Sequence, residues 1–144
     1  MTDLKTRLTP IIPVAIPALV LGIAIGSIGT GALQAQQSGI KRTPLQKVTL
    51  SDVPGKEAVM GIAEVAPGVA AGRHSHPGYE MGYALEGSST LEIEGEAPIV
   101  LSAGTAYAIP AGKVHDVKNT GSVPAKVLAI YIVDQGKPLA APAP

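Results

Sequence analysis

The three histidines of this chain are the residues whose spacing is most suited to chemistry. His74 and His76 are two residues apart, so on a β-strand both imidazoles project from one face, about 6–7 Å apart along the backbone. Glu80 follows a Pro-Gly turn and offers an anionic oxygen, and His115 could close the group from a facing strand. Three imidazoles and a carboxylate suit a divalent transition metal. Taken singly, each has an ordinary explanation, a solvated strand edge or a surface charge, so only their joint spacing makes them candidate metal ligands.

Two tyrosines near these positions are candidate catalytic residues. Tyr79 directly precedes Glu80, and Tyr107 lies eight residues before His115. A phenol that lines a pocket can donate or accept a proton during a reaction. The alternative is that both side chains pack against the protein with the hydroxyl at the surface.

The composition excludes several classes of function. The chain has 144 residues and no cysteine, which rules out disulfides, thiolate metal sites and a thiol nucleophile. Lysine plus arginine equals aspartate plus glutamate at 11 each, so no basic field is available for nucleic acid. Apolar residues make up 46% but aromatic residues only 3%. The core must therefore be built from Val, Ile, Leu and Ala.

The pattern after residue 46 indicates an all-β domain. Gly-containing turn signals recur at short intervals, and between them lie short runs rich in Val, Ile, Leu and Tyr. Residues 91–94 alternate between apolar and acidic, as a half-buried strand does. Close turn spacing favours a small barrel or sandwich. The clearest strands are expected at residues 58–65, 79–85, 90–94, 99–101, 105–109 and 125–133.

Two motifs in this region resemble those of the cupin superfamily. The first is a glycine, five residues, His-x-His, three residues, a glutamate, six residues and a glycine. All five fixed positions are present, namely Gly68, His74, His76, Glu80 and Gly87.

The second motif is a glycine, five residues, Pro-x-Gly, two residues, a histidine, three residues and an asparagine. It is also complete, with Gly104, Pro110, Gly112, His115 and Asn119. Thr105 is a departure, because the family often carries aspartate there, at a position that shapes a turn. Asn119 is expected to hold a turn in place.

The resemblance implies a cupin-type double-stranded β-helix, or jelly-roll barrel, with one divalent ion held by His74, His76, Glu80 and His115. Three neutral imidazoles and one carboxylate suit Fe, Mn, Ni, Cu or Zn, with open positions for other ligands. Because the fold hosts many reactions, two hypotheses stay open. The first is a metal-dependent enzyme, an oxidoreductase or lyase, acting on an oxygenated organic substrate. The second is a non-catalytic module that binds metal or a small ligand. A homodimer also stays open.

The N-terminal 35 residues have the layout of a secretory signal peptide. Lys5 and Arg7 precede an uncharged run over residues 8–39, which becomes small and polar around Ala35. A retained membrane anchor is the alternative, since the run exceeds the roughly 20 residues that span a bilayer. Both place the rest of the chain outside the cytoplasm, either periplasmic or secreted, or anchored and facing the periplasm.

These observations predict four regions. Residues 1–35 are the signal peptide or anchor, and residues 36–46 are a linker or arm. Residues 47–134 form a single barrel domain, and residues 135–144, rich in proline and alanine, form a tail without regular structure.

Overall fold

The computed structural model describes residues 38–144, which form ten β-strands. The expected signal peptide or anchor, residues 1–35, lies outside the described residues. Within residues 38–144, no helix is long and apolar enough to cross a membrane. The strands are β1 (Ile40–Thr49), β2 (Lys56–Val65), β3 (His74–Ser75), β4 (Gly78–Glu86), β5 (Ser88–Ile93), β6 (Ile99–Ser102), β7 (Ala106–Ile109), β8 (His115–Lys118), β9 (Ala125–Asp134) and β10 (Ala141–Pro142).

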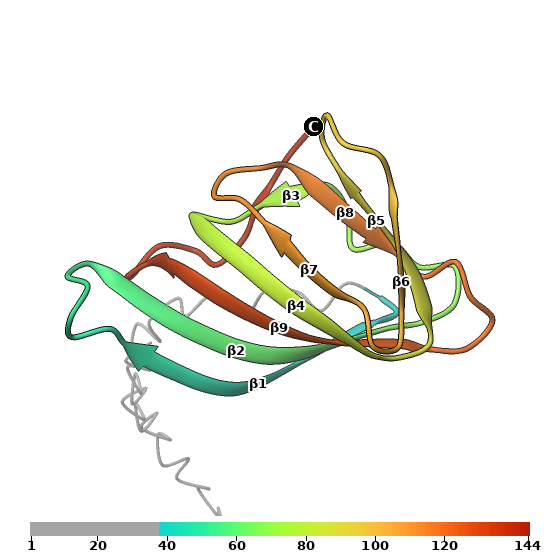
Figure 1. Cartoon of the computed structure of the whole chain (residues 1–144), viewed down its shortest axis with the longest axis horizontal. Helices are drawn as coiled ribbons and strands as arrows, with labels where there is room; N and C mark the ends of the chain where they lie inside the picture. Colours follow the sequence, from blue (N-terminus) through green and yellow to red (C-terminus); the bar gives the residue numbers. More distant parts are fainter. Residues whose placement is uncertain (1–37) are drawn as a thin grey trace, which may run out of the picture. The chain divides into compact units, whose positions relative to one another are not determined.

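The strands form two five-stranded antiparallel sheets. The first has the order β1-β2-β9-β4-β7, and the second has the order β10-β3-β8-β5-β6 (Figure 1). From β3 to β9 the chain crosses repeatedly from one sheet to the other, as a jelly-roll requires. The expected all-β, double-stranded β-helix is confirmed.

The hydrophobic core lies between the sheets at one end of the barrel. It contains Leu91 and Ile93 of β5, Leu101 of β6, Ile109 of β7 and Ala84 of β4. In β5 the intervening acidic residue faces solvent, so the alternation in the sequence is the alternation of the strand's two faces. With no Phe or Trp in the chain, these aliphatic side chains make the core.

Asn119 holds the turn before β9, as expected. Its side chain is fully buried and its amide nitrogen donates to the carbonyls of Val65 and Val123, each at 2.8 Å. Its amide oxygen accepts from the Gly121 N–H at 2.9 Å. Three hydrogen bonds satisfy a polar group that would be costly to bury alone.

Residues 36–46 were expected to be a linker or arm, and the linker alternative is wrong from Ile40 onward. Ile40 begins β1, which pairs with β2 along its whole length apart from a register shift between Pro44 and Gln46. Most of β1 is exposed because it is an edge strand, so its sequence carries no apolar alternation. Backbone hydrogen bonds to β2 hold β1 in place, and such bonds do not require a particular pattern of side chains.

The expected tail at residues 135–144 is also partly wrong. Ala141 and Pro142 form β10, which pairs with Ser75 and His74 of β3. Arg73 Nε donates to the main-chain oxygen of Pro144 at 2.8 Å, and the Arg73 carbonyl accepts from the Ala143 N–H at 2.9 Å. The barrel therefore extends from Ile40 to the C-terminal segment rather than over residues 47–134.

Candidate metal centre

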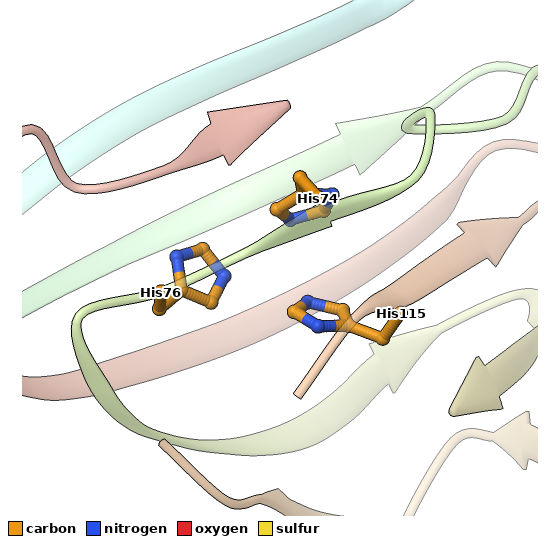
Figure 2. A group of neighbouring side chains, drawn as sticks. All are labelled: His74, His76 and His115. Carbon is orange, nitrogen blue, oxygen red and sulfur yellow. The ribbon is translucent and has the colours of Figure 1, made fainter. Parts of the chain in front are cut away.

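The three histidines come together at one end of the barrel interior. His74 lies on β3 directly opposite His115 of β8, and His76 follows β3 by one residue. Their ring centroids are 4.3 Å apart for His74 and His115, 4.9 Å for His74 and His76, and 5.1 Å for His76 and His115. Figure 2 shows the three rings converging from two neighbouring strands. The strand parity inferred from the sequence places them correctly.

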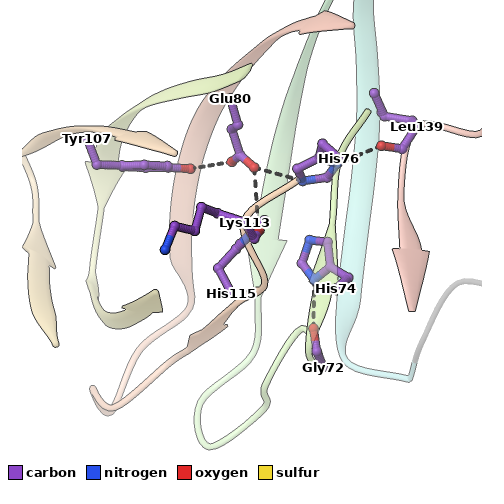
Figure 3. A network of polar contacts seen from close by, with 8 residues as sticks. All are labelled: Gly72, His74, His76, Glu80, Tyr107, Lys113, His115 and Leu139. Atoms are coloured by element: carbon purple, nitrogen blue, oxygen red, sulfur yellow. Dashed lines mark hydrogen bonds and ion pairs between the residues drawn. The ribbon is translucent and has the colours of Figure 1, made fainter. Parts of the chain in front are cut away.

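Each of these imidazoles uses its Nδ1 atom to contact a main-chain carbonyl. His74 Nδ1 lies 2.6 Å from the Gly72 oxygen, and His115 Nδ1 lies 3.0 Å from the Lys113 oxygen. His76 Nδ1 lies 2.6 Å from the Leu139 oxygen in the C-terminal segment (Figure 3). A carbonyl only accepts, so each Nδ1 carries the proton. In the neutral ring this leaves a lone pair on Nε2, the state of a metal ligand.

Glu80 of β4 places its carboxylate beside this cluster. Its Oε2 lies 2.9 Å from His76 Nε2 and 3.4 Å from His115 Nε2, and its Oε1 accepts a 2.8 Å hydrogen bond from the Tyr107 hydroxyl. Burial acts to raise the pKa of Glu80. The close contacts of His115, His76 and Tyr107 outweigh burial and lower the pKa to about 2. The carboxylate is therefore ionised throughout the physiological range.

The pKa values of two histidines move in opposite directions. Burial lowers the pKa of His74, because desolvation disfavours the imidazolium form. Burial also acts to lower the pKa of His115, but hydrogen bonds to Glu80 and to the Lys113 carbonyl raise it above its ordinary value. The Glu80 carboxylate stabilises both a proton on His115 and a cation bound at the cluster, so protonation of His115 and cation binding compete.

The donor set fits a divalent transition ion. One ligand atom each of His74, His76 and His115 lies within 4.8 Å of the others, close enough to bind a single ion. His76 Nε2 is buried and lies at ion-pair distance from Glu80, yet it has no hydrogen-bond partner among the described residues. A buried lone pair without a donor is costly in a folded chain and is satisfied by a cation. The role of the four residues as ligands stays a prediction.

A cavity of about 500 Å³ opens beside the cluster. Its floor is made by the three histidines and Glu80, and most of its wall is aliphatic. The size lies within the usual range for small-molecule sites, which combine apolar walls with a few polar groups. The remaining lining residues come from the β1-β2-β9 side of the barrel, from β7 and β8, from the segment before β3 and from the C-terminal segment: Ile40, Arg42, Ala63, Val65, Ala71, Gly72, Arg73, Tyr107, Val117, Val127, Ala129, Tyr131, Leu139, Ala140 and Pro142.

Of the two tyrosines expected to be catalytic, only Tyr107 lines this cavity. Tyr79 is 56% exposed and points to the outside of the sheet, because it neighbours the inward-facing Glu80 on β4. The expectation that it lines the pocket is wrong. The Tyr107 hydroxyl donates a hydrogen bond to Glu80. Burial and the neighbouring carboxylate strongly raise the pKa of Tyr107. Its hydroxyl therefore orients the Glu80 carboxylate, and a catalytic role for Tyr107 stays a prediction.

Sequence reasoning missed Tyr131, Arg42 and Leu139. Tyr131 lines the cavity on β9, and its ring lies 4.8 Å from that of His76. It shares strand parity with the buried Ala129 and Val133, so reading parity along residues 125–133 would have placed it inside. Arg42 belongs to the unexpected strand β1. Leu139 contacts His76 through its main-chain carbonyl, and a main-chain contact cannot be predicted from a pattern of side chains.

A jelly-roll barrel with three histidines and a glutamate at one end of its cavity defines the class of protein. Residues 61–131 match the family model described as the cupin domain. The chain is 34% identical over 107 residues to the tetracenomycin polyketide synthase protein TcmJ of Streptomyces glaucescens, covering 74% of this chain and 67% of that protein. This chain belongs to the cupin family.

Solved structures share the fold at lower identity. The DMSP lyase DddQ from Ruegeria pomeroyi superposes with a TM-score of 0.55 at 22% identity, covering 60% of this chain and 43% of that one. A recombinant oxalate oxidase in complex with glycolate has a TM-score of 0.59 at 23% identity, covering 75% of this chain and 57% of that one. This chain thus spans less than half of the lyase's length.

Proposed function

We propose that this protein is an extracytoplasmic, metal-dependent cupin enzyme that acts on a small, oxygen-rich organic anion. The observation that carries the proposal is the convergence of three Nδ1-protonated imidazoles and an ionised carboxylate on one cavity. His74, His76, His115 and Glu80 would hold the ion, which supplies Lewis-acid or redox chemistry when bound. The enzyme class would be an oxidoreductase or a lyase.

The cavity supports the proposed substrate class. Its aliphatic wall excludes water from the substrate's carbon skeleton, while Arg42 supplies a positive charge at the exposed edge strand. The Arg42 guanidinium has no carboxylate or hydrogen-bond partner among residues 38–144, so it is available to an incoming anion. The oxalate oxidase neighbour is in complex with glycolate, a small hydroxycarboxylate, which favours the same class.

The tyrosines would have different roles in turnover. Tyr107 holds Glu80 through its hydroxyl proton and keeps the carboxylate directed at the histidines. Tyr131 places a phenol on the cavity wall next to His76, where it can hydrogen-bond a substrate oxygen. Burial raises the pKa of Tyr131, so at neutral pH it acts as a hydrogen-bond donor.

A non-catalytic binding module is the second candidate. It is favoured by the absence, among the described lining residues, of a carboxylate other than Glu80 that could serve as a general base. Under this alternative the same cavity would bind metal and an anion without converting it.

Metal analysis followed by a screen of small carboxylates tests the proposal. We expect close to one transition metal per chain, lost in His76→Ala and His115→Ala, and weakened in Glu80→Gln, which keeps an oxygen but removes the charge. Glu92→Gln, on the exposed face of β5, is the matched control and should keep its metal. Turnover of a screened carboxylate by the loaded protein would support the enzyme, and binding without turnover would support the module. Full metal content in a His76→Ala/His115→Ala double variant would contradict both.

A further inference from the structure

Arg42 is a charged residue on the inner face of an edge strand. It pairs with Ala63 of β2, which in turn pairs with Val127 of β9, and all three line the cavity. Residues paired directly across neighbouring strands project from the same face of a sheet. The next inward pair along β1 and β2 is the aliphatic Ile40 and Val65. A guanidinium therefore occupies a row in which the other side chains are aliphatic.

The Arg42 guanidinium has no partner of opposite charge among the described residues. The adjacent Lys41 pairs with Glu64 at 3.2 Å. Arg73, the other arginine that lines the cavity, pairs with Glu94 at 3.0 Å. Within residues 38–144, Arg42 makes neither an ion pair nor a side-chain hydrogen bond. Its charge is thus available to an anion that enters the cavity.

The Tyr131 hydroxyl is a second free donor within electrostatic reach of Arg42. Burial and the Glu80 carboxylate raise the pKa of Tyr131, and the positive charge of Arg42 acts in the opposite direction. The Tyr131 ring also lies 4.8 Å from the His76 ring, and its hydroxyl has no hydrogen-bond partner within residues 38–144. A carboxylate that accepts from both Arg42 and Tyr131 would receive one charge-assisted and one neutral hydrogen bond.

The cavity is larger than a two-carbon anion requires. An apolar cavity of about 150 Å³ holds one benzene molecule. At the same ratio, the volume of about 500 Å³ beside the histidines has room for roughly three such molecules. Glycolate is smaller than benzene, so it would leave most of this space to water.

The space that glycolate would leave unfilled is bounded largely by aliphatic side chains. They come from both sheets and from the C-terminal segment, and the larger ones are Ile40, Val65, Val117, Val127, Leu139 and Pro142. Water in contact with such a wall is released when an apolar group of a ligand replaces it, and the gain grows with the area removed from water. An anion that carries an apolar group therefore fits this cavity better than a fully polar one.

We propose that the substrate is a carboxylate that carries a ring or a short alkyl chain, and that Arg42 binds its carboxylate while the apolar group packs on the aliphatic wall. Tyr131 donates a second hydrogen bond to the same carboxylate. This inference rests on the proposed function for the reaction, but the binding it describes requires no turnover. The alternative for Arg42 is that an inward charge protects the edge strand from pairing with another chain.

Calorimetric titration of the protein as purified with 2-hydroxycarboxylates tests the assignment. Glycolate and 2-hydroxyhexanoate share the same charged group and differ by a butyl chain. We expect 2-hydroxyhexanoate to bind at least about 50-fold more tightly, because each buried methylene contributes roughly three- to fourfold in affinity. Mandelate, which carries a phenyl ring instead, should also bind more tightly than glycolate.

Removal of the Arg42 charge tests the carboxylate site. Arg42→Gln should weaken the binding of 2-hydroxyhexanoate about 10- to 100-fold, the usual effect of losing a hydrogen bond to a charged group. Lys41→Gln is the matched control, because it removes the neighbouring exposed cation of β1, and its affinity should stay within about twofold of the wild type. The neutral 2-hydroxyhexanamide keeps the alkyl chain, so the wild type and Arg42→Gln should bind it equally.

Three results would overturn the inference. The first is that 2-hydroxyhexanoate binds no more tightly than glycolate or does not bind. The second is that Arg42→Gln binds 2-hydroxyhexanoate as the wild type does, the result expected if the arginine only protects the strand edge. The third is that Arg42→Gln weakens the amide as much as the carboxylate. The proposed function fails on different evidence, a missing metal or absent turnover, so the two failures are distinguishable.

Discussion

At the scale of single residues, main-chain carbonyls decide the state of the candidate ligands. Gly72, Lys113 and Leu139 each fix a proton on an Nδ1 atom, so the Nε2 lone pair of each imidazole is left for a cation. The Nε2 atoms of His76 and His115 lie beside Glu80. Outer contacts of this kind orient metal ligands and raise their basicity. Tyr107 does the same for the carboxylate. Of the two tyrosines that line the cavity, Tyr107 uses its hydroxyl on Glu80, whereas the Tyr131 hydroxyl has no hydrogen-bond partner within residues 38–144.

We expect Tyr131→Phe to lower turnover roughly 10²-fold while metal content is retained, because it removes a hydrogen-bond donor from the cavity wall and no ligand. Tyr79→Phe is the matched control, since Tyr79 lies on the outer face, and its turnover should be unchanged. Steady-state rates and metal analysis of both variants make the comparison. Equal rates for Tyr131→Phe and the wild type would remove Tyr131 from the mechanism.

At the scale of elements, the C-terminal segment connects the barrel to the candidate metal centre. Leu139 accepts from His76, and β10 pairs with the strand that carries His74. Two of the three imidazoles therefore depend on residues that follow the last long strand.

We expect a chain ending at Lys137 to bind metal 10- to 100-fold more weakly than the wild type, the usual effect of removing an outer contact to a ligand. Leu139→Ala is the control, because it keeps the main-chain carbonyl, and its affinity should stay within a few-fold of the wild type. Competition titration with a chelating dye measures both. An unchanged affinity in the shortened chain would show that His76 does not need this carbonyl.

A second element-scale prediction concerns Asp134, at the end of β9. Hydrogen bonds from Lys56 and Lys137 hold its pKa at about 2, below the ordinary value of 3.8. Because the folded-state pKa is the lower one, the stabilisation is fully present above pH 3.8 and is lost as pH falls towards 2. Unfolding free energies of metal-free protein should therefore decline less steeply between pH 5 and 2 in Asp134→Asn than in the wild type. Asp52→Asn, in the exposed turn before β2, should follow the wild type, and identical slopes in all three chains would refute the role of Asp134.

At the scale of the whole molecule, the chain combines a barrel with an N-terminal segment of different character. We expect N-terminal sequencing of protein from its native compartment to find a start near Gln36, because a basic start, an apolar run and small residues before Ala35 direct export and cleavage. An intact Met1 in the membrane fraction would indicate the anchor instead. Full-length protein recovered in solution from the cytoplasm would contradict both.

The sequence by itself determined the all-β class, the family resemblance and the grouping of His74, His76, His115 and Glu80. These follow from local rules, since strand parity, turn residues and motif spacing are all readable over a few positions. The same rules cover Tyr79, because neighbouring residues on a strand face opposite sides. Since Glu80 points into the barrel, Tyr79 points to the outside of the sheet.

Only the tertiary structure decided what depends on main-chain pairing between distant segments. β1 and β10 are positioned by backbone hydrogen bonds to β2 and β3, and those bonds do not require a particular side-chain pattern. For the same reason the carbonyl of Leu139 could not be foreseen as a partner of His76, 63 residues away in the chain. Strand parity places Tyr131 inside the barrel, but its position beside His76 comes from strand order, which brings β9 between β2 and β4.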